Sequence, residues 1–158
     1  MQQELRLYSF VNYYLSPIQQ GVQTGHAAVD LVRKYNAPRG TPSAIGKQID
    51  MVADWADNFK TFIILNGGNN ASLLEALSIV ELNSFPNIHF HEDAASLNGL
   101  LTCVAVVVPE DIFNCKPIRE FGEITAFTNY KTGYHIEGEK DINLFNFTKL
   151  ITTSGLAR

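Results

Sequence analysis

Features that would place this chain in a functional class are scarce. Only two of its 158 residues are cysteines, Cys103 and Cys115, too few for a disulfide framework and without the C-x-x-C spacing of a metal site. We therefore expect a reduced, cytoplasmic protein with no cofactor. The longest strongly apolar run, residues 100–109, is about half of the ~20 residues that a helix needs to cross a bilayer. The N-terminus also lacks a basic segment followed by an apolar one, so no membrane or secretory segment is expected.

Positive charge is also in short supply. Twelve Lys and Arg against sixteen Asp and Glu give a formal net charge of −4. The chain therefore has no overall basic field that would attract a polyanion such as nucleic acid. Bulky apolar side chains, in contrast, are plentiful: ten Phe, six Tyr and one Trp in a composition that is 46% hydrophobic. This content suits one folded domain and excludes disorder over most of the chain.

The hydrophobic pattern predicts an α/β architecture. Residues 5–15 are apolar on both faces, which is typical of a strand covered on both sides. The pattern then predicts, in order, a helix over about 20–35, a helix from 41 to about 56, a strand at 61–65, a helix over 71–82, and strands at 88–91 and 101–108. This order predicts a small mixed four-stranded sheet sandwiched by helices.

The segment from residue 111 onward is rich in aromatic side chains but has no sustained period. We expect a domain over 1–110 and a C-terminal extension over 111–158, with a short strand near 124–129 and a turn at 131–133. The extension is too apolar to be a free tail. We expect it to wrap over the domain or to complete an oligomer contact, and we expect a homodimer or higher homo-oligomer.

The most informative segment, residues 16–29, leads from the first strand into its helix. It places His26 in the first or second turn, where outward-pointing backbone N–H groups favour a phosphate or carboxylate. His26 could act there as a proton donor, a proton acceptor or a hydrogen-bond partner. The alternative is a partly buried histidine at a strand–helix junction, with Gly25 allowing a close approach to the sheet. On spacing alone this alternative is favoured.

This segment resembles a motif of the type 2 peptidyl-tRNA hydrolases, whose first strand runs into G-K-G-K-x-x-x-Q-x-x-H-A at the start of a long helix. The matching residues are Gln23, His26, Ala27 and Ala28. The similarity continues in the family's order through Trp55, the strand led by Lys60, a Leu-rich helix, a strand ending in Asp93-Ala94, and a last strand from Thr102 to Pro109. The resemblance implies the fold of that family.

The resemblance also implies site residues. His26 and Asp93 would position or activate water for attack on the ester between peptide and tRNA, and Thr102 and Gln23 would orient the substrate. We therefore predict catalytic roles for His26, Asp93 and Thr102. The predicted ligand-binding residues are Gln19, Gln23, Thr24, Gly25, Asn66, Gly67, Gly68 and Asn98.

Departures from the family motif decide how much function is carried over. The two lysines of the motif fall on Pro17 and Gln19, and the loop after Asp93 is shorter than the D-A-G-x-T-x-I pattern. Affinity for tRNA rests largely on Lys and Arg contacts to phosphates, so these losses weaken tRNA binding. We therefore favour a protein, for example a viral one, that binds and sequesters a small nucleotide-type anionic ligand near His26. An active peptidyl-tRNA hydrolase is the alternative, and a purely structural interaction protein is a third.

Two further segments carry weaker signals. In residues 66–70, Asn-Gly-Gly-Asn-Asn, the glycines would let backbone approach a ligand after a strand, although a turn with an Asn helix cap is the favoured interpretation. His89, His91, Glu92 and Asp93 form the only dense set of potential metal ligands, and alternation puts the two histidines on one strand face. Two ligands do not make a site, so no metal is predicted.

Overall fold

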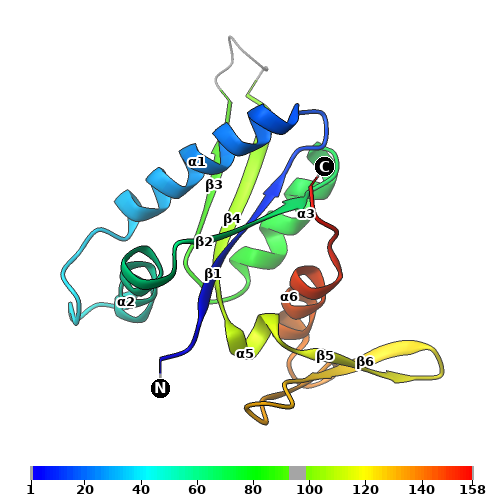
Figure 1. Cartoon of the computed structure of the whole chain (residues 1–158). Helices are drawn as coiled ribbons and strands as arrows, with labels where there is room; N and C mark the ends of the chain where they lie inside the picture. Colours follow the sequence, from blue (N-terminus) through cyan, green and yellow to red (C-terminus); the bar gives the residue numbers. More distant parts are fainter. Residues whose placement is uncertain (1, 93–98, 158) are drawn as a thin grey trace.

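The computed structural model describes residues 2–92 and 99–157 and is built around a four-stranded mixed sheet (Figure 1). The strand order is β2-β1-β4-β3. The strands are β1 (Leu5–Val11), β2 (Thr61–Asn66), β3 (Asn87–His91) and β4 (Leu101–Pro109). β1 pairs in parallel with β2, while β4 is antiparallel to both β1 and β3. The predicted mixed four-stranded sheet is confirmed.

Helices cover both faces of this sheet (Figure 1). The helices α1 (Pro17–Lys34) and α2 (Gly46–Asp54), with the π-helical turn η1 (Trp55–Phe59), lie on one face, and α3 (Asn70–Glu81) and α6 (Ile142–Thr153) lie on the other. Alternate residues of β1 belong to the two cores: Leu7 packs under α1 and α2, and Phe10 packs against α3 and α6. This is the two-sided burial predicted for the first strand. Within the described residues, no helix is long and apolar enough to cross a membrane.

The chain beyond residue 109 packs on the α3 side. It contains α5 (Glu110–Phe113), β5 (Lys116–Glu120), β6 (Glu123–Thr128) and β7 (His135–Glu137), and these strands form a second, antiparallel sheet before α6. Phe127 and Phe147 are fully buried in the same core as Phe10. The last residues run along β2, where the Asn66 N–H donates to the Gly155 carbonyl (2.9 Å). The outer edge of β2 is thereby covered.

Two helices begin at residues other than those predicted. Ser16 accepts a hydrogen bond from the Gln19 N–H (3.2 Å), and the Gln19 side chain accepts one from the Ser16 N–H (3.0 Å). This capping box, with Pro17 in the first turn, starts α1 at Pro17, ahead of the predicted start near residue 20. His26 is the tenth residue of α1, about 13 Å along its axis at 1.5 Å per residue. Its predicted place in the first or second turn is therefore wrong. α2 begins at Gly46 instead of residue 41, because residues 43–45 form a bend and a turn before it.

Candidate functional site

The predicted site residues converge on one edge of the sheet. β1, β2 and β3 all end at this edge and β4 begins there, because β4 is antiparallel to its neighbours. The N-termini of α1 and α3 lie at the same edge (Figure 1). Ligands of open α/β sheets bind at such an edge, beyond the carboxyl ends of parallel strands.

Gln23 is the centre of a hydrogen-bonded cluster at this edge. Its side chain is buried between α1 and the sheet. Its Nε2 donates to Glu92 Oε2 at 2.7 Å, and its Oε1 lies 3.3 Å from the Thr102 hydroxyl, which also donates to the Phe90 carbonyl at 3.1 Å. Because Glu92 is a carboxylate, the first of these hydrogen bonds is charge-assisted. The structure thus brings together two predicted site residues, Gln23 and Thr102.

Thr102 reaches α1 because β4 is irregular at this point. Phe90 pairs with Cys103, but His91 pairs with Leu101, so Thr102 is an extra residue in β4. An extra residue of this kind turns side chains away from strict alternation, and such bulges occur often beside functional sites. Leu101 can therefore enter the core under α3 while Thr102 meets Gln23.

His26 lies less than one turn beyond Gln23 on α1. Its imidazole is exposed, and its ring centre lies 5.1 Å from that of the half-buried Phe90. The aromatic contact and the helix hold the imidazole in place while leaving it open to a ligand. The other two residues predicted to surround it, Asp93 and Asn98, lie outside the described residues.

Three predicted ligand-binding residues of α1 have other surroundings. Gln19 is exposed, and its side chain serves the capping box with Ser16. Gly25 is exposed on the outer side of the helix. Thr24 is buried: its Oγ1 lies 2.9 Å from Ser9 Oγ, which in turn lies 3.0 Å from Cys103 Sγ. Thr24 therefore meets a polar partner inside the core and not the surface that a ligand would contact.

Both cysteines, Cys103 and Cys115, are buried. Burial raises the pKa of the Cys103 thiol to about 11. Burial also raises the pKa of Cys115 to about 11. A nucleophilic cysteine needs the opposite shift, because the thiolate is the reactive form. Neither thiol is suited to nucleophilic catalysis.

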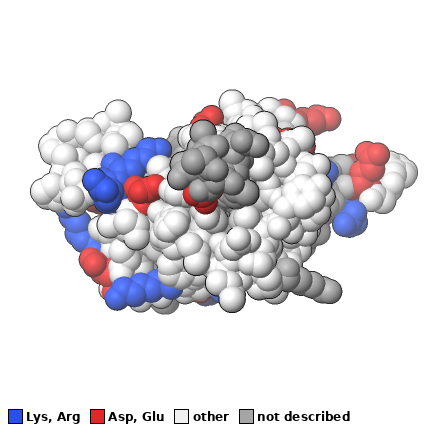
Figure 2. Space-filling view, turned by 90° about the horizontal axis from the view of Figure 1, so that it is seen from above, with Lys and Arg blue, Asp and Glu red and all other residues white. Residues whose placement is uncertain are grey.

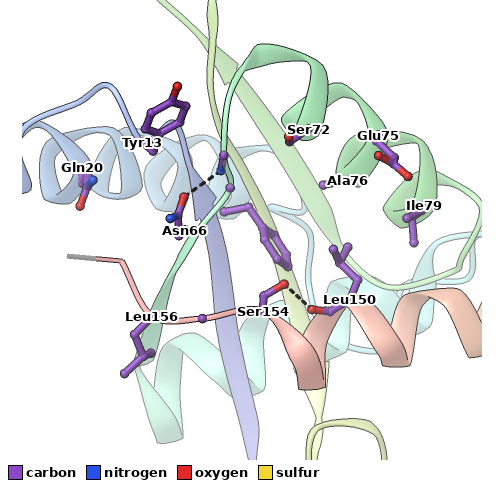
Figure 3. A pocket seen from close by; sticks show the side chains of 14 residues that line it. Tyr13, Gln20, Asn66, Ser72, Glu75, Ala76, Ile79, Leu150, Ser154 and Leu156 are labelled. Carbon is purple, nitrogen blue, oxygen red and sulfur yellow. Dashed lines mark hydrogen bonds between the residues drawn. The ribbon is translucent and has the colours of Figure 1, made fainter. Parts of the chain in front are cut away.

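Asn66, Gly67 and Gly68 line a cavity of about 700 Å³ at the same edge (Figure 3). Phe10 and residues of α3 and α6 form its apolar wall. Among the described residues that line the cavity, Glu75 is the only charged one. A carboxylate without a cation does not suit a phosphate group, so this cavity fits a neutral or amine-bearing molecule better than an anion.

Packing within the chain explains why two glycines and an asparagine follow β2. A Cβ atom on Gly67 would lie 2.9 Å from the Val11 carbonyl oxygen and 2.5 Å from Leu73 Cδ2. Gly68 has a φ of +73°, and the Asn69 side chain accepts a hydrogen bond from the Ser72 N–H at 2.9 Å. These are the features of a turn followed by an Asn helix cap, the interpretation that the sequence favours.

Among the residues that the structure describes, basic side chains do not gather around the cluster. Arg33 and Lys34 lie in the last turn of α1, about 10 Å or more along the axis from His26. Arg39 is paired with Asp54 and Asp57. In Figure 2, which views the molecule from above, the visible face is mostly uncharged, and Lys and Arg lie mainly toward its left side.

His89 and His91 lie side by side on β3, as predicted, with ring centres 5.2 Å apart. Burial, and the nearby imidazole of His91, lower the pKa of His89. Over residues 2–92 and 99–157, no group of three or more His, Cys, Asp and Glu side chains is placed to hold a metal ion.

When the chain is compared with known proteins, no family model matches it and no curated protein gives a significant match.

Two members of the cluster were not predicted as site residues. Glu92 was considered only as a potential metal ligand, and Phe90 was not considered. For Glu92 the sequence did hold a signal, because this residue adjoins Asp93 and the resemblance already placed an acidic site residue at the end of this strand. Nothing in the local sequence indicates the contact between His26 and Phe90.

Proposed function

We propose that this chain is a divergent relative of the type 2 peptidyl-tRNA hydrolases that binds and sequesters a small nucleotide-type ligand at the cluster around His26 and Gln23. One observation carries the proposal. An exposed imidazole, supported by the Phe90 ring, lies less than one turn along α1 from Gln23, which donates a hydrogen bond to the carboxylate of Glu92.

These side chains suit the base of a nucleotide. Aromatic rings stack on nucleobases, and this stacking is worth about 1–3 kcal/mol per base in single-strand binding proteins. The carboxylate of Glu92 is a hydrogen-bond acceptor, as the ring N–H and amino groups of a guanine or adenine require. Gln23 donates to Oε2 of Glu92, and a donor on the ligand would bind the same carboxylate.

Charge favours one orientation of such a ligand. The negative charge of Glu92 repels phosphate, so the base would lie toward Glu92 and the phosphate away from it. The N-termini of α1 and α3 carry the positive ends of the helix dipoles, and neither helix has an acidic residue in its first turn. In α1 fewer N–H groups are available for a direct contact, because Pro17 has no N–H and the capping box uses that of Gln19.

Hydrolysis of peptidyl-tRNA is a second candidate function. What supports it is the contact between Gln23 and Thr102 next to His26, three residues that the resemblance places in the hydrolase site. What opposes it is the replacement of the motif's lysines by Pro17 and Gln19 and the few cations on this face.

The two functions are separated by a pair of assays. We expect a thermal-shift screen of nucleoside monophosphates and cyclic dinucleotides to find a ligand that raises the melting temperature of the native chain and of the control His135→Ala, but not of His26→Ala. A ligand at 100 times its Kd stabilises by about 2.7 kcal/mol. In a single-turnover assay on peptidyl-tRNA we expect no hydrolysis. Turnover that His26→Ala abolishes would establish the hydrolase instead, and no stabilisation by any nucleotide would refute the binding function.

A further inference from the structure

A cavity between α3 and α6 lies apart from the cluster around Gln23 (Figure 3). Its volume of about 700 Å³ falls within the range of about 300–1,000 Å³ that small-molecule sites have. The described residues that line it belong to α3, to α6 and the segment after it, and to the ends of β1 and β2 with the turns that follow, together with Gln20 of α1. Gln23, His26 and Thr102 are not among them. We call this space the α3–α6 cavity.

The two helices are joined at the end opposite the cavity. Asn83, which follows α3, donates from Nδ2 to the Asn143 carbonyl in the first turn of α6 (3.2 Å). Phe85 stacks on Phe147, with ring centres 4.8 Å apart. At the cavity end, the residues that face the space are small: Ser72, Ala76, Ser154 and Gly155. Their short side chains leave the gap between the helices unfilled, whereas protein interiors are ordinarily close-packed.

Hydrogen bonds fix the wall of the cavity next to β2. The Gly155 carbonyl accepts from the Asn66 N–H (2.9 Å), and the Ala157 N–H donates to the Ile64 carbonyl (3.0 Å). Leu156, between these two contacts, lines the cavity. The wall is therefore formed before a ligand arrives, as is usual for small-molecule sites.

Charge in the lining favours a cation. Glu75 is the only charged residue among the described ones that line the cavity. α6 ends at Thr153, so the negative end of its helix dipole lies at the same place. The N-terminus of α3 would favour an anion, but its Ser72 N–H already donates to the Asn69 side chain (2.9 Å). A ligand with a positive charge thus suits this cavity better than one with a negative charge.

We propose that the α3–α6 cavity binds a small molecule that joins a protonated amine to an apolar or aromatic body. The body lies between Ile79 of α3 and Leu150 of α6, which face each other across the cavity, with Phe10 as a further apolar surface (Figure 3). Burial of this body supplies most of the affinity. The amine pairs with Glu75 and sets the orientation. Because the same carboxylate repels a phosphate, this site is independent of the proposed nucleotide function.

The first test is a titration of the ¹⁵N-labelled native chain with 2-phenylethylamine, followed by NMR at pH 7. We expect saturable shifts of the backbone amide signals of cavity residues such as Gly68 and Ser154, and weaker binding of the uncharged 2-phenylethanol. Glu75→Gln should weaken binding of the amine by about two- to fivefold, the effect of an ion pair that solvent partly screens. The control Glu81→Gln removes the same charge at the end of α3, outside the cavity lining, and should bind as the native chain does.

The second test fills the cavity. Ala76 is buried and lines it, so the larger side chain of Ala76→Leu should occupy the space, abolish binding of the amine and leave the melting temperature unchanged or higher. Three results would overturn the proposal: no saturable shift with 2-phenylethylamine, equal affinity of the amine for the native chain and Glu75→Gln, or undiminished binding to Ala76→Leu. Shifts centred on Gln23 and His26 in place of the cavity residues would also overturn it.

Discussion

The hydrogen bond between Gln23 and Glu92 predicts how charge changes at either position affect stability. Gln23→Glu would place a second carboxylate at the 2.7 Å contact. Two unit charges 4 Å apart repel by about 4 kcal/mol at an effective dielectric constant of 20, and the half-buried state of Glu92 reduces this figure. A hydrogen bond to a charged group, worth about 1.5–3 kcal/mol, is lost as well. We therefore expect Gln23→Glu to lower the free energy of unfolding at pH 7 by about 3 kcal/mol.

The reciprocal change should restore much of this loss. Glu92→Gln alone replaces a charged hydrogen bond by a neutral one and should cost about 1 kcal/mol. The double variant Gln23→Glu/Glu92→Gln again pairs one carboxylate with one amide, so its stability should return close to that of the native chain. The control is Gln19→Glu, the same chemical change one turn earlier in α1, where a glutamate suits the capping box and the helix dipole.

Urea unfolding followed by the fluorescence of the buried Trp55 measures these free energies. A double-mutant cycle should give a coupling energy of about 2 kcal/mol or more between the two positions. Additive effects, within about 0.5 kcal/mol, would refute the described contact. A loss of stability in Gln19→Glu equal to that in Gln23→Glu would show that the effect belongs to the helix and not to the cluster.

Three further predictions concern other parts of the fold. Because burial raises the pKa of Cys103 from 9.0 to about 11, the stability that its protonated form contributes is complete below pH 9 and is lost as the pH rises through 11. Urea unfolding between pH 8 and 11 should show a steeper decline for the native chain than for Cys103→Ala, and equal slopes would contradict this. Gly67→Ala should lower the free energy of unfolding by about 1–3 kcal/mol, since its Cβ would press on the Val11 carbonyl; an unchanged melting temperature would argue against that packing. Phe121 is fully exposed at a φ of +53°, a conformation that costs a non-glycine residue roughly 1–2 kcal/mol, so Phe121→Gly should raise the melting temperature, and a fall would be inconsistent with the described turn.

The sheet could be predicted because its strands carry their own signal. β1 is apolar at both odd and even positions, as Leu7 and Phe10 illustrate, and only a strand covered on both faces buries both sets. The start of α1 could not be read in the same way. Ser-Pro ends a strand in some contexts, but it is also a cap followed by a first-turn proline, and only the reciprocal contact with Gln19 distinguishes the two.

The hydrophobic pattern also could not predict which side of α1 packs on the sheet. Apolar residues at helical spacing predict a helix, but the spacing does not say which side meets the sheet when both sides carry apolar residues. Ala27, Ala28 and Leu31 face inward, and Val29 and Val32 face outward. The small inward residues let α1 lie close to the sheet, where Gln23 can reach β4.

The candidate site was predictable only in part. The resemblance placed Gln23 and Thr102 together, and the structure has them in contact. The role of Glu92 depends on the irregular pairing of β3 with β4, which no local sequence signal indicates. Thr24 was expected to meet a ligand because of its place in the segment, but helical geometry directs it to Ser9 in the core.

The measurement that tests the proposed function most directly is a calorimetric titration of the native chain with nucleoside monophosphates and cyclic dinucleotides. We predict saturable binding of at least one of them, roughly 5- to 150-fold weaker binding to His26→Ala, since losing one stacking contact with a base costs about 1–3 kcal/mol, and unchanged binding to His135→Ala. No binding of any of these ligands, or equal affinity for the native chain and His26→Ala, would contradict the proposed function.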